Sequence, residues 1–385
     1  MSVNPTVFIV AGEPSGDQLG AGLMAALSSA TNNRIHFAGI GGEAMVSQGL
    51  TSLFPMEELS VMGLVEVVPR IPLLSRRINE TAELIKRLQP AAIVTIDSPG
   101  FNFRVVRQLR NINIPIIHYV APTVWAWKPK RAKEMVRLFD HLMVLLPFER
   151  QYFEKEGLAC TFVGHPAAKH KDLDSGERFR NEYHLSDSTV LGVFPGSRIS
   201  EIQRMLPVFT DTVRLLQTTT PNLHILITIV SGTKNIIEKY MNNFSVPVTL
   251  VENRMDKPAA FQACNIALAT SGTITTELAA VGTPMVVGYK MAPVTMAIAR
   301  RLVKVPHITL INLVLGKEVV PEFIQGCCTP VALAEALRTL ITDSQARILQ
   351  IDSLKDGIHL LGGNGIDPAQ RAAKVVEAAI KKPRC

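Results

Sequence analysis

Short runs of apolar residues alternate with longer amphipathic segments along most of the chain. The runs are continuously apolar, which is typical of strands buried on both faces of a parallel sheet. The segments between them repeat their apolar residues at helical spacing. We expect strands within residues 7–12, 35–41, 91–97, 114–120, 141–146 and 160–164, and again within 190–198, 223–232, 246–253, 265–272 and 284–289.

The alternation of strands and helices lapses once, in the polar stretch of residues 165–188. We interpret this stretch as the end of one domain and a connection to the next. The sequence therefore predicts an α/β fold of two tandem Rossmann-like domains, with parallel sheets and a ligand cleft between the domains. The expected parts are an N-terminal domain (1–168), the connection (169–188), a C-terminal domain (189–365) and a final helix that packs back on the N-terminal domain (366–385).

Composition narrows the class of partner. The 385 residues are 47% hydrophobic, which is ample for two cores, and the formal charge of +7 favours anionic partners such as phosphates, nucleotides or a membrane surface. No apolar run reaches the ~18 residues of a membrane span, so any membrane contact is expected to be peripheral. The first apolar run leads into a glycine turn, which predicts a strand and not a signal peptide. Five cysteines without a C-x-x-C pair are typical of a reducing cytoplasm.

The loop at residues 12–22 follows the first expected strand and opens a helix. Its glycines let a ligand approach the backbone, and a helix start favours an anion. Glu13 lies in the turn itself, and we expect it at the mouth of the cleft together with Ser15. The alternative interpretation is structural: Ser15 caps the helix, and Asp17 is favourable in its first turn.

The segment PGSRISE, residues 195–201, is the counterpart in the second domain. Gly196 and Ser197 would expose backbone N–H groups, and Arg198 would add a guanidinium, a combination that suits a diphosphate. The alternative is that Ser197 or Ser200 caps a helix and that Arg198 is solvated.

A second loop of this kind is ATSGTITTE, residues 269–277. Ser271, Gly272 and Thr273 lead from a strand into a helix. Glu277 lies about one turn further on, where a carboxylate can accept hydrogen bonds from two ribose hydroxyls. The alternative is an ordinary glutamate stabilised by the helix dipole. Two such loops together favour a nucleotide site.

Asp97 ends a strongly apolar expected strand, in the segment AAIVTIDSPGFNF. A carboxylate at that place is costly to bury unless it is paired, hydrated or used. Ser98 is a good N-cap and Pro99 a good first helical residue, so helix capping does not require Asp97. We predict that Asp97 is a general base. A structural aspartate bonded to a neighbouring backbone N–H remains the alternative.

Both tryptophans of the chain, Trp125 and Trp127, lie in one proline-flanked loop after an expected strand. They predict an apolar wall of the cleft with a basic rim. A packed loop before a solvated helix is the alternative, and interleaved bases and aromatics in one short cluster are weak evidence for nucleic acid.

Residues 61–78 combine apolar side chains with arginines and two prolines. Apolar and basic side chains in one loop are the pattern of an interfacial membrane contact. A buried strand followed by a helix start explains the pattern nearly as well. The candidate membrane residues are Val65, Val67, Val68, Ile71, Leu73 and Leu74.

The segment Asp172-Leu173-Asp174 has the D-x-D pattern of a metal-binding motif. It lies in the polar connection and not after a buried strand, so we interpret it as solvated. The nine histidines form no H-x-x-x-H pair. We predict that the protein uses no metal and no cofactor.

Nine strings in order across nearly the whole chain resemble bacterial lipid-A-disaccharide synthases. The strings are AGEPSGD, MEELSVMGLVEV, IDSPGFN, HYVAPTVWAW, LPFE, FVGHP, PGSR, TSGTITTEL and PMVVGYK. SVMGLVEV and the WAW loop are specific to that family, whereas PGSR and SGT…E would suit any two-domain nucleotide-sugar enzyme. Lys169 departs from the family pattern, where many members have an acidic residue after GHP.

The resemblance implies an inverting GT-B glycosyltransferase. It would join UDP-2,3-diacylglucosamine to 2,3-diacylglucosamine 1-phosphate and release UDP, without a metal. The enzyme would be cytoplasmic and peripherally bound to the anionic inner-membrane surface, with no nucleic-acid partner. A homodimer is left open.

The resemblance also implies roles for single residues. Asp97 would take the proton from the acceptor 6-hydroxyl group. Arg198 and the turn 271–273 would hold the diphosphate, and Glu277 the ribose. Asn312 matches another polar position of the family's donor site. The pair Glu13 and Ser15 falls in the family's first cleft loop.

Three other functions compete with this interpretation. An isomerase of the UDP-N-acetylglucosamine 2-epimerase kind would share the double fold but have no use for a membrane-facing loop. A non-catalytic nucleotide-sugar binding protein would not depend on Asp97. A nucleic-acid binder would require salt-dependent binding.

Overall fold

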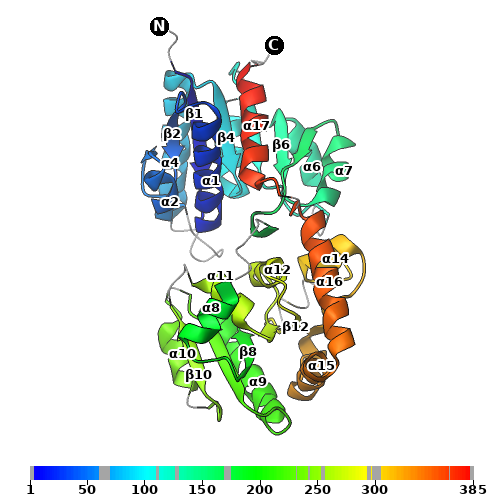
Figure 1. The fold of residues 1–385 in the computed structure, drawn as a ribbon. Helices are drawn as coiled ribbons and strands as arrows, with labels where there is room; N and C mark the ends of the chain where they lie inside the picture. Colours follow the sequence, from blue (N-terminus) through cyan, green and yellow to red (C-terminus); the bar gives the residue numbers. More distant parts are fainter. Residues whose placement is uncertain are drawn as a thin grey trace. The chain divides into compact units, whose positions relative to one another are not determined.

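The structure, a computed structural model, divides the chain into two units, Met1–Pro166 with Ile366–Cys385, and Ala167–Gly365. Each unit holds one parallel sheet flanked by helices (Figure 1). The residues that the structure describes are 4–59, 70–109, 112–125, 130–168, 175–230, 232–241, 243–252, 256–292, 296, 305–363 and 365–381.

The sheet of the first unit has seven strands in the order β3-β2-β1-β4-β5-β6-β7. Every pair is parallel, and β1 lies between β2 and β4. The continuously apolar strands follow from this position, because both faces of the sheet are covered. The strands are β1 (Thr6–Ala11), β2 (His36–Ile40), β3 (Thr51–Ser52), β4 (Ala92–Ile96), β5 (Ile116–Tyr119), β6 (His141–Val144) and β7 (Ala159–Phe162).

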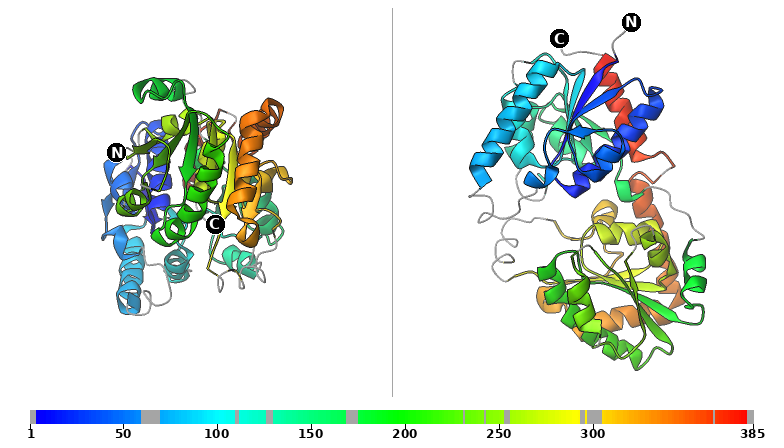
Figure 2. Two further views of the ribbon diagram at one scale, coloured as in Figure 1. Left: turned by 90° about the horizontal axis from the view of Figure 1, so that it is seen from below. Right: turned by 90° about the vertical axis from the view of Figure 1, so that its left-hand side faces the viewer.

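Helices cover both faces of this sheet. Helix α17, from the end of the chain, packs beside α1 on one face, and α4 packs with α5 on the other (Figure 2). The helices are α1 (Pro14–Ala30), α2 (Glu43–Ser47), α4 (Ile71–Leu88), α5 (Pro99–Arg107), α6 (Lys130–Val136), α7 (Arg150–Glu154) and α17 (Pro368–Lys381).

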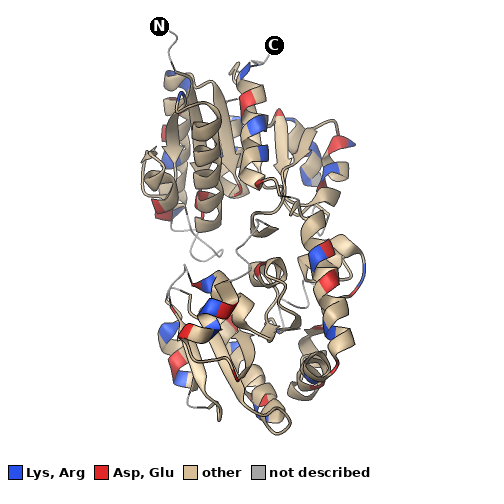
Figure 3. Ribbon diagram, viewed as in Figure 1, with Lys and Arg blue, Asp and Glu red and all other residues tan. Residues whose placement is uncertain are grey.

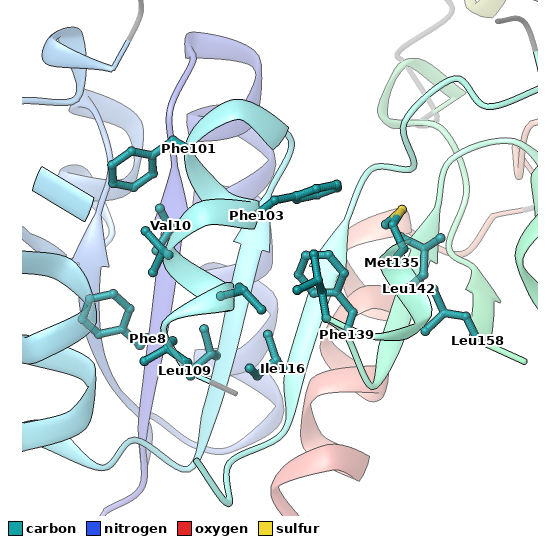
Figure 4. Close-up of a cluster of buried hydrophobic side chains, with 14 of the residues drawn as sticks. Phe8, Val10, Phe101, Phe103, Leu109, Ile116, Met135, Phe139, Leu142 and Leu158 are labelled. Atoms are coloured by element: carbon teal, nitrogen blue, oxygen red, sulfur yellow. The ribbon is translucent and has the colours of Figure 1, made fainter. Parts of the chain in front are cut away.

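Side chains of β1 alternate between two cores. Phe8 and Val10 join the cluster under α4 and α5, whereas Val7 and Ile9 join the cluster under α1 and α17. This is the two-residue period of a strand. Figure 4 shows the first of these clusters, in which Phe8 and Val10 lie among side chains of α5 and the neighbouring strands.

The sheet of the second unit has six strands in the order β10-β9-β8-β11-β12-β13, again all parallel. The strands are β8 (Thr189–Phe194), β9 (Leu223–Thr228), β10 (Val248–Val251), β11 (Ile266–Ala269), β12 (Met285–Tyr289) and β13 (Glu322–Ile324). The helices are α8 (Ser175–Glu182), α9 (Ile199–Gln217), α10 (Lys234–Met241), α11 (Lys257–Ala263), α12 (Thr273–Ala280), α14 (Leu310–Leu315), α15 (Pro330–Thr342) and α16 (Ser344–Leu360).

The predicted α/β class with two Rossmann-like parallel sheets is confirmed. Every strand expected from an apolar run is present, while the two short strands β3 and β13 were not expected. Charged residues lie on helices and loops and almost never on strands (Figure 3). Among the described strands, Glu322 of β13 is the one Asp, Glu, Lys or Arg residue. No helix in the described part of the chain is long and apolar enough to cross a membrane.

Candidate active site

The strand order of the first unit reverses between β1 and β4, because β2 and β3 lie on one side of β1 and β4 on the other. Doubly wound sheets bind ligands at this switch point, beyond the carboxyl ends of the strands. Ala11 and Ile96, the last residues of β1 and β4, are register partners. The turn at Gly12 and Asp97 therefore lie side by side at the predicted place.

Asp97 occupies an unusual backbone conformation. Its φ is +46° and that of Ser98 is +44°, so two consecutive non-glycine residues are left-handed. Each such residue costs about 1–3 kcal/mol and persists only when its surroundings hold it. The backbone N–H of Asp97 donates to the carbonyl oxygen of Tyr119 at 2.9 Å, which ties the strained turn to β5.

Asn102 holds the same turn from inside α5. Its side chain is fully buried, and its Nδ2 donates to the carbonyl oxygens of Asp97 at 2.8 Å and Ile96 at 3.2 Å. Ile96 is the last residue of β4 and Asp97 follows it, so both carbonyls lie where the regular pairing of the sheet ends. Asn102 thus fixes the backbone that carries Asp97.

The carboxyl group of Asp97 is suited to accept a proton. Its side chain is half-buried. Desolvation by burial raises the pKa of Asp97 above its ordinary value, and a hydrogen bond from the Ser98 backbone lowers it in part. Among the described residues no ion pair neutralises this carboxylate. A more basic carboxylate is the better general base at neutral pH.

Ser98 is the N-cap of α5 and Pro99 its first residue, as predicted, but the predicted capping hydrogen bond is absent. The buried Ser98 hydroxyl has no partner among the described residues. It lies against Gly12, where an added Cβ would come within 2.6 Å of Ser98 Oγ. Gly12 is therefore needed for the close approach of the two loops.

The structural alternative for the first loop was wrong in its choice of cap. Glu13, not Ser15, is the N-cap of α1, and Ser15 is an exposed residue of the first turn. Buried Asp17 accepts hydrogen bonds from the backbone of Gly42, Ala44 and Met45, and so caps α2. Glu13 remains beside the switch point as a cleft candidate.

Trp125 lies in the loop after β5, the strand next to β4. Its indole Nε1 donates to Glu149 Oε1 at 3.1 Å, and its ring packs edge-on against Phe148 at 5.2 Å. Trp125 is thus held at the same edge of the sheet as Asp97. Trp127 lies outside the described residues.

The second unit repeats this arrangement. Its strand order reverses between β8 and β11, whose last residues, Phe194 and Ala269, are register partners. Thr270 donates through its backbone N–H to the carbonyl oxygen of Phe194 at 3.0 Å. The loops 195–198 and 270–273 therefore adjoin each other at the switch point, in front of the first turns of α9 and α12.

Arg198 is largely exposed, at 64% of its side chain, as the alternative interpretation expected, and it pairs with an acidic residue. It is the N-cap of α9, and its Nη1 lies 3.1 Å from Glu201 Oε1. The Tyr289 hydroxyl donates to the same oxygen at 3.2 Å. Neither Ser197 nor Ser200 caps the helix, so the capping alternative is wrong. Gly196, with φ +117°, gives the loop a conformation that other residues rarely adopt.

The turn of residues 271–273 opens α12, with Gly272 as its N-cap at φ +156°. The Ser271 hydroxyl donates to the carbonyl oxygen of Ile308 at 2.8 Å. Thr273 is the first helical residue, and its backbone N–H belongs to the end of the helix that attracts anions. Glu277, one turn later, pairs with Lys257 at 2.9 Å.

Asn312, which the resemblance assigns to the donor site, lies in α14. Its side chain is fully buried. Its Nδ2 donates to Val320 O and Glu322 Oε1, and its Oδ1 accepts from the backbone N–H groups of Val319 and Val320. Direct contact with a donor would require one of these bonds to break. The structure gives Asn312 a structural role in holding the loop before β13.

Several expected features fall wholly or partly outside the described residues. Val65, Val67 and Val68, the Asp172–Asp174 segment and Lys169 all lie there. Of the candidate membrane residues, Ile71 is exposed at the start of α4, and Leu73 and Leu74 are half-buried. Among the described residues no group of three or more His, Cys, Asp or Glu is arranged to hold a metal ion.

Sequence reasoning missed four side chains that shape these two sites: Asn102, Glu149, Glu201 and Lys257. Asn102, Glu149 and Glu201 each stand inside a motif that the sequence had singled out. Their polarity alone gave no sign that they would bond to the backbone or to a partner side chain.

The fold and the paired loops define a GT-B protein, the class in which two Rossmann-like units build a nucleotide-sugar enzyme. A putative UDP-N-acetylglucosamine 2-epimerase from Listeria monocytogenes has this fold, with a TM-score of 0.64 at 14% identity over 98% of this chain and 95% of that one. The MurG protein of Acinetobacter baumannii gives 0.58 at 12% identity over 97% and 99%.

The chain belongs to the lipid-A-disaccharide synthase family. The family model described as lipid-A-disaccharide synthetase matches residues 7–376. The lipid-A-disaccharide synthase of Rhodospirillum centenum is 44% identical over 380 residues, which cover 98% of this chain and 95% of that protein. The resemblance noted in the sequence is thereby confirmed, and the protein is a glycosyltransferase.

Proposed function

We propose that this protein joins UDP-2,3-diacylglucosamine to 2,3-diacylglucosamine 1-phosphate, with inversion to a β-1,6 linkage and release of UDP. Family membership supports the reaction class, since the relatives that match along the whole chain are lipid-A-disaccharide synthases. The observation that carries the mechanism is Asp97, a carboxylate with a raised pKa on an anchored, strained turn at the switch point of the first unit.

In this proposal Asp97 removes the proton from the acceptor 6-hydroxyl group as that oxygen attacks the anomeric carbon of the donor. The new C–O bond forms on the face opposite the breaking bond to UDP, which gives inversion. The strained turn places the carboxylate before substrate arrives, so little reorganisation is needed. Glu13 and Trp125, at the same edge of the sheet, line the acceptor side.

The second unit holds the donor. Arg198 and the N–H groups of residues 196–198 and 271–273 stabilise the negative charge that develops on the UDP leaving group. Glu201 keeps the Arg198 guanidinium in place, and Glu277 accepts hydrogen bonds from the ribose. Positive charge from helix ends and one arginine supplies the stabilisation that a leaving diphosphate needs.

The acyl chains of both substrates place the reaction at a lipid surface. We propose that the protein is cytoplasmic and contacts the anionic inner membrane peripherally through residues 65–74. The exposed side chain of Ile71 and the net charge of +7 support this contact.

The reaction is tested by incubating detergent-solubilised protein with both lipids in the presence of EDTA. We expect UDP and disaccharide in equal amounts, and no UDP when the acceptor is omitted. Folded protein that forms no disaccharide would contradict the proposal. Conversion of the donor alone to an epimer would instead indicate an isomerase, whose fold is shared.

A further inference from the structure

Glu149 is a buried carboxylate to which the proposed transfer reaction gives no role. It ends the segment Pro147–Glu149 after β6, and it is 3% exposed. Its Oε1 accepts the indole N–H of Trp125 at 3.1 Å, and its Oε2 accepts the backbone N–H of Leu146 at 3.0 Å. Both oxygens therefore serve as hydrogen-bond acceptors.

The described part of the loop after β5, residues 120–125, is strained at its start. Val120 has a φ of +80°, which is rare for a β-branched residue, although its N–H still donates to Met143 O at 3.0 Å. A tight turn follows, in which the N–H of Val124 lies 2.6 Å from the carbonyl oxygen of Pro122. Such a conformation persists only when its surroundings hold it. At Trp125 the loop is held by the hydrogen bond to Glu149 and by the ring contact with Phe148.

Among the described residues no cation pairs with Glu149. Arg150 and Glu154 of α7 pair with each other. Cys160 of β7 interacts electrostatically with Glu149, and burial raises the pKa of its thiol. Burial raises the pKa of Glu149 to about 7, although hydrogen bonds from Trp125 and from the Leu146 and Leu145 backbone lower it in part.

We propose that Glu149 is a positioning residue that holds the loop of residues 120–125 through the Trp125 indole. Protonation of the carboxyl group loosens this hold. A proton on either oxygen weakens one of the two acceptor bonds. The inference rests on the proposed function in one respect, that Trp125 lines the acceptor side. Loss of the carboxylate should therefore affect the acceptor and not the donor.

Tryptophan fluorescence tests the inference without any substrate. The chain has two tryptophans, so Trp127→Phe leaves Trp125 as the single reporter. We expect its emission to change with pH around a midpoint of about 7, and Glu149→Gln in the same background to remove this transition. An emission that is flat between about pH 5.5 and 8.5, or a transition that survives Glu149→Gln, would overturn the proposal.

Glu154→Gln is the matched control, because Glu154 is a nearby but exposed carboxylate that pairs with Arg150. It should leave the Trp125 transition in place. Loss of the transition in this variant would assign the titration to α7 and contradict the proposal.

Steady-state kinetics then separate positioning from general destabilisation. Glu149→Leu, which removes both acceptor oxygens, and Trp125→Phe should each raise the acceptor KM about 2- to 12-fold, as expected for the loss of one hydrogen bond to the indole, with the donor KM unchanged. The double variant should show less than the product of the two single effects, because both changes remove the indole bond. Equal rises in the acceptor and donor KM values would contradict the positioning role of Glu149. So would a double variant whose effect equals the product of the two single effects. A fluorescence transition in protein that forms no disaccharide would refute the proposed function alone.

Discussion

The side-chain amide of Asn102 donates a 2.8 Å hydrogen bond to the main-chain carbonyl oxygen of Asp97. Asn102 therefore anchors the backbone of the proposed base through main-chain carbonyl groups and does not bond to its carboxylate. The bond spans the start of α5, where two consecutive residues are left-handed. A local anchor of this kind allows a strained turn to persist at a functional site.

Replacing Asn102 by leucine should keep the volume of the side chain and remove the anchor. We expect kcat to fall about 10²-fold with small changes in either KM, because the base is misplaced while the substrate sites remain. The free energy of unfolding should fall by about 1–3 kcal/mol, since two carbonyls lose their donor. Steady-state kinetics and urea unfolding measure the two effects. A variant with wild-type kcat would show that the turn keeps its conformation without the Asn102 hydrogen bonds.

Arg198→Ala should lower kcat about 10²- to 10³-fold, because one donor to the developing charge on UDP is lost. The matched control is Arg214→Ala, near the end of the same helix, which also pairs with an acidic residue three positions away. The control should keep wild-type kinetics. Similar losses in both variants would indicate an effect on α9 rather than on the leaving group.

The raised pKa of Glu149 predicts a pH-dependent stability. In the folded protein this pKa is about 7, above the ordinary value of 4.5, so the folded state binds the proton more tightly. The free energy of unfolding should therefore decrease as the pH rises from 4.5 to 7, by up to about 3 kcal/mol. Urea unfolding of wild type and Glu149→Gln at several pH values measures the difference. Equal pH dependence in both proteins would contradict the burial argument.

Ile71→Ser should weaken binding to vesicles of anionic phospholipid about 3- to 10-fold, because part of an apolar side chain no longer enters the interface. Leu88→Ser is the matched control: the two side chains are 47% and 39% exposed and lie on the same helix, about 25 Å apart. Sedimentation with vesicles measures both. Equal binding of Ile71→Ser and wild type would show that residue 71 takes no part in the membrane contact.

The fold was predictable because continuous apolar runs such as those within 91–97 and 265–272 leave few alternatives to a buried parallel strand. The positions of Asp97 and of the loop at 195–198 followed from the same pattern, since they come directly after strands. The strand order then brought each of them to a switch point, which agrees with the general rule for such sheets.

Side-chain partners were much less predictable. The buried positions of Asn102, Glu149 and Asn312 depend on contacts that only the folded chain makes. The assumed cap at Ser15 failed because Pro14 already begins the helix one residue earlier. Helix-capping propensity favours serine, whereas the backbone conformation after β1 makes Glu13 the N-cap.

The central claim, that Asp97 is the general base, is tested most directly by the pH dependence of kcat/KM for the acceptor at saturating donor. In wild type, kcat/KM should rise with pH as Asp97 loses its proton, with a midpoint above the ordinary pKa of an aspartate because burial raises it. In the Glu149→Gln background, which removes the separate titration of that carboxyl group, Asp97→Asn should lower kcat/KM about 10²- to 10⁴-fold and abolish this rise. A folded Asp97→Asn protein that keeps both the wild-type rate and the rise with pH would contradict the claim.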